Sequence, residues 1–145
     1  MCDRLVPPAD ESDPVVRFAP NLLQLTSATF LVPGAVCVAQ GRLVGVSVHC
    51  GNAVCSVYVH RPNRTAVDNA GDIFDHFFVA MWVCYNTYIL ACERPASSAF
   101  AVGCAVCVAC AKVWTKCLKY RSLQRYAVHA CMHVFGTLGS MALLL

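Results

Sequence analysis

Apolar and polar positions divide the chain into a polar arm, a Val-rich part and a longer apolar part. Between about residues 28 and 60, short Val-rich runs are broken by glycines, and Val46 and Val48 lie two positions apart. Val enrichment and a spacing of two are typical of β-strands. Gly51-Asn52 between two such runs is typical of a hairpin turn. The pattern therefore predicts a small β-part over about residues 28–60.

The second half predicts two helices, at about residues 72–92 and 98–133. Asp72 is placed to cap the first helix. Pro95 ends it, because proline forces the preceding residue out of the helical region. The second helix runs through a cysteine-rich stretch and a basic run, or breaks near Tyr120.

Together these elements predict an α+β fold. Residues 1–21 are rich in proline and acidic residues and have little to bury, so we expect an extended or disordered arm. Residues 22–145 have a length that suits a single Cys-rich α+β domain.

Composition adds a second interpretation. Hydrophobic residues make up 58% of the chain and charged residues 13%, whereas a soluble domain is nearer about 25% charged. The apolar surface must then be covered by a partner or a membrane. The alternative to a soluble domain is a three-pass membrane protein with spans near 77–92, 95–111 and 126–145 and a cytoplasmic basic loop. His129 and His133 argue against the third span, because ionisable groups inside a membrane are costly.

Two sets of residues are candidate zinc ligands. Cys107 and Cys110 share a helix face at a spacing of three, and His129 and His133, at a spacing of four, complete a Cys2His2 set. The alternative is that these thiols are small apolar packing residues.

The second set is His49, Cys50 and Cys55, with His60 nearby. Two strands joined by a tight turn would aim Cys50 and Cys55 at one ion. Alternatively, Cys55 lies in the core and His60 on the surface. No secretory signal precedes the eleven cysteines, so reduced thiols are expected.

A basic run follows the cysteine-rich stretch. Its cations are interleaved with aromatic and aliphatic residues, which favours an acidic partner or RNA; a solvated helix surface is the alternative. The candidate partner-binding residues are Lys112, Lys116, Lys119, Arg121 and Arg125. The sequence has no phosphate-binding glycine loop, nucleophile elbow or paired acidic motif, so no enzyme is predicted.

Several short motifs resemble, in order, segments of the adenoviral early-region-four 34K protein family. They are Thr29–Val38, His49–Cys55, Gly71–Val79, the Cys107–Ala111 element and the basic run before Ala127-Val128. The chain is similar to a shortened, divergent member of that family.

The resemblance implies a viral early regulatory adaptor that acts in the host nucleus and also in the cytoplasm. The implied partners are the viral large early-region-one-B protein and host cullin–elongin ubiquitin-ligase components. It also implies zinc as a structural cofactor held by cysteines and histidines, and a role in the export of late viral messages.

Overall fold

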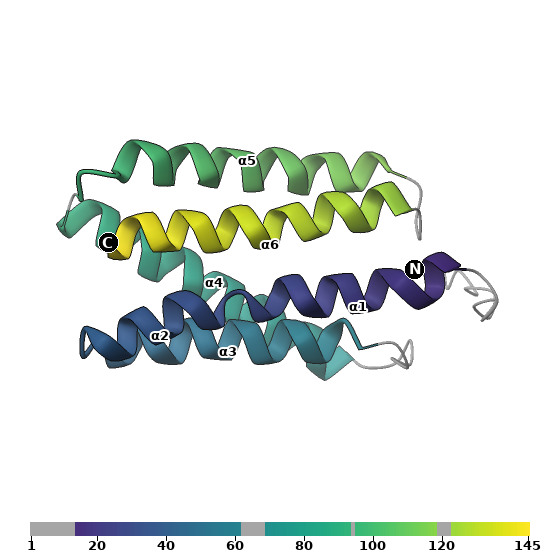
Figure 1. The fold of residues 1–145 in the computed structure, drawn as a ribbon, viewed down its shortest axis with the longest axis horizontal. Coiled ribbons are helices and arrows are strands. Elements are labelled where there is room, and N and C mark those ends of the chain that lie inside the picture. The colour runs from purple at the N-terminus through teal and green to yellow at the C-terminus, as the bar shows by residue number, and fades with distance from the viewer. Residues whose placement is uncertain (1–13, 62–68, 94, 119–122) are drawn as a thin grey trace.

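The computed structural model describes residues 14–61, 69–93, 95–118 and 123–145, and every regular element in them is an α-helix (Figure 1). The helices are α1 (Pro14–Ala28), α2 (Leu31–Ala39), α3 (Leu43–Val59), α4 (Asn69–Cys92), α5 (Ser98–Cys117) and α6 (Leu123–Leu144).

The predicted β-part, and with it the α+β fold class, is wrong. Residues 28–60 form α2 and α3, and Gly51-Asn52 lies in the middle of α3 instead of at a turn. A short apolar run cannot be told from a buried helical segment by its periodicity. The β-preference of valine is small and depends on context, so packing overrides it.

In the second half, α4 and α5 lie where helices were predicted, but a single helix over residues 98–133 is wrong. The helix α5 ends at Cys117, Leu118 has an extended backbone with φ −86° and ψ 148°, and α6 begins at Leu123. The result is a helical hairpin of α5 and α6. Residues 1–13 of the predicted arm lie outside the described residues, and α1 begins at Pro14.

All helices except α4 run along one long axis of the molecule (Figure 1). The helix α2 continues in the direction of α1, α3 returns beside them, α4 crosses obliquely, and α5 and α6 form the hairpin. One end of the bundle, here called the N end, holds the start of α1, the end of α3, the start of α4, the end of α5 and the start of α6. The opposite end, here called the C end, holds the chain terminus at Leu145.

Glycines let α3 pack closely on its neighbours. A Cβ added at Gly45 would lie 2.5 Å from Cys37 Sγ and 2.8 Å from Tyr85 Cζ. A Cβ added at Gly51 would overlap the Phe78 ring of α4. Small residues at helix interfaces allow this close approach, which is common in bundles that pack without a large hydrophobic driving force.

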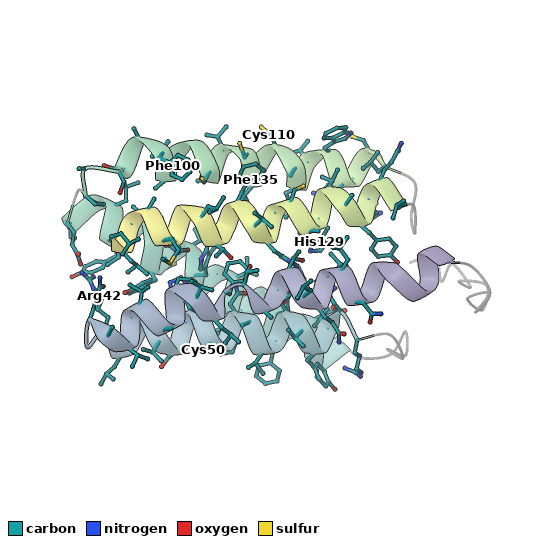
Figure 2. All side chains as sticks on the ribbon, viewed as in Figure 1. Arg42, Cys50, Phe100, Cys110, His129 and Phe135 are labelled. Carbon is teal, nitrogen blue, oxygen red and sulfur yellow. The ribbon has the colours of Figure 1, made fainter. Side chains whose placement is uncertain are left out.

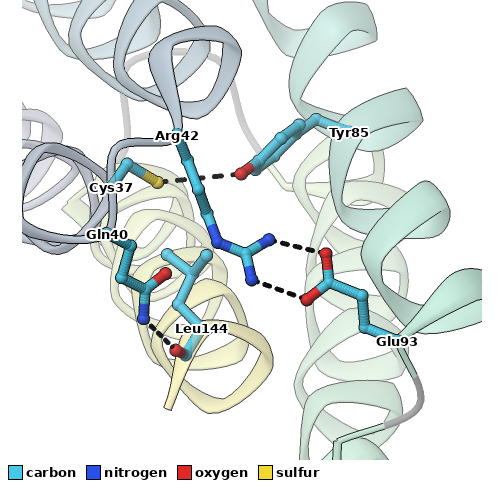
Figure 3. A network of polar contacts seen from close by, with 6 residues as sticks. All are labelled: Cys37, Gln40, Arg42, Tyr85, Glu93 and Leu144. Atoms are coloured by element: carbon cyan, nitrogen blue, oxygen red, sulfur yellow. Dashed lines mark hydrogen bonds and ion pairs between the residues drawn. The ribbon is translucent and has the colours of Figure 1, made fainter.

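Polar contacts join the helix ends at the C end (Figure 3). Arg42 donates two hydrogen bonds of 2.6 Å to the carboxylate of Glu93, which links the start of α3 to the end of α4. Gln40 Nε2 donates to the Leu144 carbonyl at 2.6 Å, which links the end of α2 to α6. Hydrogen bonding to the Arg42 guanidinium holds the pKa of the Glu93 carboxyl below its ordinary value.

The glycine packing is tested by Gly51→Ala, with Gly103→Ala as the matched control. Gly103 of α5 faces open space, with no atom within 4 Å of an added Cβ. We expect Gly51→Ala to lower the free energy of unfolding by about 1–3 kcal/mol through overpacking. We expect Gly103→Ala to raise it by up to about 1 kcal/mol through helix propensity. Denaturation in mild detergent followed by circular dichroism measures both, and equal effects would contradict the packing.

The ion pair at the C end is tested by Glu93→Gln. Because the folded-state pKa of Glu93 is lowered, its carboxylate stabilises the fold above the unfolded-state pKa, and this is lost as the pH falls through the folded-state pKa. Both side chains are partly exposed, so we expect a loss of less than about 1 kcal/mol near pH 7. Thermal unfolding should show that the difference between wild type and variant shrinks as the pH falls below the ordinary glutamate pKa of about 4.3 and through the lowered folded-state pKa of Glu93. A stability difference that persists at low pH would show that it comes from the shape of the side chain and not from its charge.

Candidate functional site

The interior of the bundle contains polar as well as apolar side chains, and many large apolar side chains lie on its exterior. Ser27, His49 and Ser140 are at most 1% exposed. Large apolar side chains on several helices face outward, among them Leu43 at 79% and Ile73 at 68% exposure. In soluble proteins polar side chains are mostly exposed, and large exposed apolar patches are rare. Other buried polar residues are Asn52, Ser56, Thr115, His133 and Thr137.

Hydroxyl-centred hydrogen bonds join different helices inside the bundle. The pairs are Ser27 Oγ with Ser56 Oγ at 3.0 Å, Thr29 Oγ1 with Thr137 Oγ1 at 2.8 Å, and Trp82 Nε1 with Ser140 Oγ at 2.8 Å. They connect α1 with α3, the turn after α1 with α6, and α4 with α6. The interior is therefore held by specific polar pairs as well as by packing.

Three histidines come together in this interior. His129 and His133 lie one turn apart on α6, and His60 follows the last residue of α3. The ring centroids are 4.9 Å apart for His60–His129 and His129–His133, and 5.5 Å apart for His60–His133. One ring nitrogen of each lies within 4.8 Å of the others, and His133 is buried. Figure 2 shows His129 between α6 and α1. We call these three residues the histidine cluster.

Two hydroxyls of α1 orient His133. Thr26 Oγ1 donates to the Leu22 carbonyl at 3.0 Å, and Ser27 Oγ donates to the Leu23 carbonyl at 2.7 Å. His133 Nδ1 lies 3.0 Å from Thr26 Oγ1 and 3.3 Å from Ser27 Oγ. When both hydroxyls donate to the α1 carbonyls, Nδ1 of neutral His133 is the donor and Nε2 holds the lone pair.

The predicted Cys2His2 set is not brought together. Cys107 and Cys110 are exposed on α5, and Figure 2 shows Cys110 pointing away from the bundle. His129 and His133 face the interior instead, with His60. Among the described residues, the histidine cluster is the one group of three or more candidate metal ligands.

The second predicted set is also dispersed. His49, Cys50 and Cys55 all lie on α3, where consecutive residues point in different directions. His49 is fully buried beside Tyr85, at 5.8 Å between ring centroids, and neither of its ring nitrogens has a hydrogen-bond partner. The β-hairpin predicted at Gly51-Asn52, which would have brought these residues together, is replaced by the continuous helix α3.

The basic run is divided between two helices. Lys112 and Lys116 are exposed near the end of α5, and Arg125 is half-buried at the start of α6. Lys119 and Arg121 lie outside the described residues.

The grouping of His60 with the α6 pair was not predicted from the sequence. The spacing of His129 and His133 is a visible signal for two ligands on one helix face. The third ligand is brought in by the packing of α3 near α6, which no local pattern encodes.

Three helical stretches are long and apolar enough to cross a membrane by length and composition: Asn21–Ala39, Ser98–Cys117 and Leu123–Leu144. The helix α3 is a shorter apolar helix. Two of the three predicted spans, at 95–111 and 126–145, overlap these stretches; the third, at 77–92, lies in α4.

An apolar cavity of about 440 Å³ lies between α4, α5 and α6. Its lining is almost entirely apolar and includes Trp82, Val106, Phe135 and Leu143. The described structure thus offers two kinds of site, a polar one with histidines inside the bundle and an apolar one toward the outside.

No family model, curated protein or solved structure matches the chain. The resemblance to the adenoviral 34K family, and the partners and location it implies, stay predictions.

Proposed function

We propose that this chain is a polytopic membrane protein whose helices enclose a polar binding core. The observation that supports it best is the combination of many large apolar side chains on the outside with hydroxyls and imidazoles among the buried residues. In water, an apolar exterior of this extent would drive association. In a bilayer, lipid covers the apolar side chains, while polar groups are stable inside the bundle where they pair with one another.

The helix lengths support this placement. A bilayer core is about 30 Å thick, and a spanning helix needs roughly 17–25 residues. The three longest apolar stretches have 19, 20 and 22 residues, and α3 and α4, of 17 and 24 residues, run between the same two ends of the bundle. With α1 and α2 counted as one crossing, the six helices make five crossings.

The distribution of charge supports one orientation. The described cationic side chains at the N end are Arg61, Lys112, Lys116 and Arg125, whereas Arg42 lies at the C end and is paired with Glu93. Lys and Arg gather on the cytoplasmic side of membrane proteins. The N end is therefore cytoplasmic in this proposal, and an odd number of crossings places the C-terminus on the opposite side.

The histidine cluster supports a binding function for the core. Ionisable residues within a membrane bundle are costly and mark functional sites. His60, His129 and His133 converge from α3 and α6, and α1 supplies the hydroxyls that orient His133. In this proposal the protein binds a small polar or ionic species at the cluster.

The viral adaptor role remains a separate prediction. It requires protein instead of lipid to cover the exposed apolar side chains, such as Val113 and Trp114 beside the basic residues of α5. A partner complex in the soluble fraction would favour it over the membrane proposal.

Membrane integration is tested by alkaline carbonate extraction of membranes from cells that express the chain. We expect the chain to stay in the pellet and to be released only by detergent, because its apolar exterior is in contact with lipid. A peripheral membrane protein and a known integral protein serve as controls. Release into the carbonate supernatant would overturn the proposal.

The orientation is tested with epitope tags at the two termini in intact and permeabilised cells. We expect the N-terminal tag to react only after permeabilisation, and the C-terminal tag to lie on the opposite side of the membrane. In sealed microsomes, protease should remove the N-terminal tag and spare the C-terminal one. Tags on the same side would contradict five crossings.

A further inference from the structure

We propose that His60, His129 and His133 bind one divalent transition-metal ion, with Zn²⁺ as the expected ion. This deepens the proposed function by naming the species that the core holds. Membrane integration is measured separately by carbonate extraction, so either proposal can fail while the other stands.

The ligand geometry supports a metal ion. Nitrogens in a tetrahedral zinc site lie about 2.0–2.1 Å from the ion and hence roughly 3.4 Å from one another. The candidate nitrogens of the cluster all lie within 4.8 Å of one another. Closing this difference requires shifts of about 1 Å, which small side-chain rotations can provide. His60 ends a helix at a capping position, with φ −90° and ψ 13°, so its ring is not held inside a helical turn.

The second feature is the preset tautomer of His133. A metal-ligating histidine usually donates its other ring N–H to an oxygen acceptor, which fixes the ring and raises the basicity of the ligating nitrogen. Thr26 and Ser27 supply such acceptors at Nδ1 when they donate their own protons to the α1 carbonyls. In this proposal His133 Nε2 is the ligand atom, and Thr26 and Ser27 are positioning residues.

The ligand set indicates which ions fit. Three neutral imidazoles suit Zn²⁺, Cu²⁺, Ni²⁺ and Fe²⁺ and are poor ligands for Mg²⁺ or Ca²⁺, which prefer oxygen. Zn²⁺ accepts three protein nitrogens and leaves a fourth position for water or an exogenous ligand.

The direct test is metal binding by the full chain purified in detergent, stripped with a chelator and titrated with Zn²⁺. We expect about one ion per chain at the cluster. His60→Ala, His129→Ala and His133→Ala should each weaken binding by about tenfold or more, since a ligand is lost. His76→Ala is the matched control, because His76 is exposed on α4 and makes its hydrogen bond to the Asp72 carbonyl, outside the cluster. It should bind as wild type does.

Two further variants test the positioning of His133 and the absence of thiolate ligands. Thr26→Val keeps the side-chain shape and all three imidazoles but removes an acceptor from His133 Nδ1; we expect about tenfold weaker binding. The double variant Cys107→Ser with Cys110→Ser should leave the affinity unchanged, because both thiols are exposed on α5 and neither belongs to the cluster. Co²⁺ as a probe should give the visible bands of a tetrahedral nitrogen site without the intense near-ultraviolet absorption of thiolate ligation.

The proposal is overturned by absence of binding, by binding that survives His60→Ala and His129→Ala, or by binding lost with the two cysteines. If His133→Ala does not fold by circular dichroism, the half-buried His60 and Thr26 variants decide the outcome. A second readout is thermal unfolding: Zn²⁺ should raise the Tm of wild type and of His76→Ala, but not that of His129→Ala.

Discussion

The arrangement of the helices depends on the hydrogen bonds that buried hydroxyls and imidazoles make across helix interfaces. A buried polar group without a partner costs about 1–3 kcal/mol or more, whereas an interhelical hydrogen bond within a membrane contributes only about 0.6 kcal/mol on average. The cost of an unpaired polar group is the larger of the two, so it decides which helix arrangement is stable. The pairs Ser27–Ser56 and Trp82–Ser140 contribute little net stability, but they penalise every arrangement that leaves them unpaired. Turning α6 by one residue, roughly 100°, would move Ser140 out of reach of Trp82.

Glycines make these short polar contacts possible. Gly136 and Gly139 lie on the same helix as Ser140, and a Cβ on Gly139 would lie 3.0 Å from Cys104 Cβ. The hairpin of α5 and α6 is therefore close-packed on a face of small residues. Close packing and polar pairing act together, since a longer distance between axes would break the hydroxyl pairs. Glycines have the same part in the Val-rich half of the chain. In the sequence they break the Val-rich runs as turns between strands would, but in the structure Gly45 and Gly51 are contact points between helices.

Helix positions in the second half could be predicted from sequence because long apolar stretches with clear ends are informative. The Val-rich half could not, because Val46 and Val48 give the same apolar signal in a strand and in a helix that is apolar on most sides. For the site, the spacing of His129 and His133 is visible along the chain. The structure groups these two histidines with His60, whereas the sequence predicted a grouping with Cys107 and Cys110. Cys107 and Cys110 also share a helix face, but that face of α5 points outward. Which face of a helix is inside is decided by its neighbours, and a local pattern does not contain that information.

The position of the histidine cluster along the bundle is consistent with the electrostatic cost of holding an ion. His60 directly follows the end of α3, and His129 lies six residues after Leu123 at the start of α6, about 9 Å along the axis at 1.5 Å per residue. The cluster is thus near the N end, and in the proposed membrane placement a dication there is desolvated less than at the bilayer centre. The C end is closed by contrast: Arg42 is bound to Glu93, and Gln40 to the last turn of α6. In the proposed membrane placement, an ion that binds the cluster therefore has its shortest path from the N end, which that placement puts on the cytoplasmic side. Orientation and binding site then depend on one feature, the unequal chemistry of the two ends of the bundle.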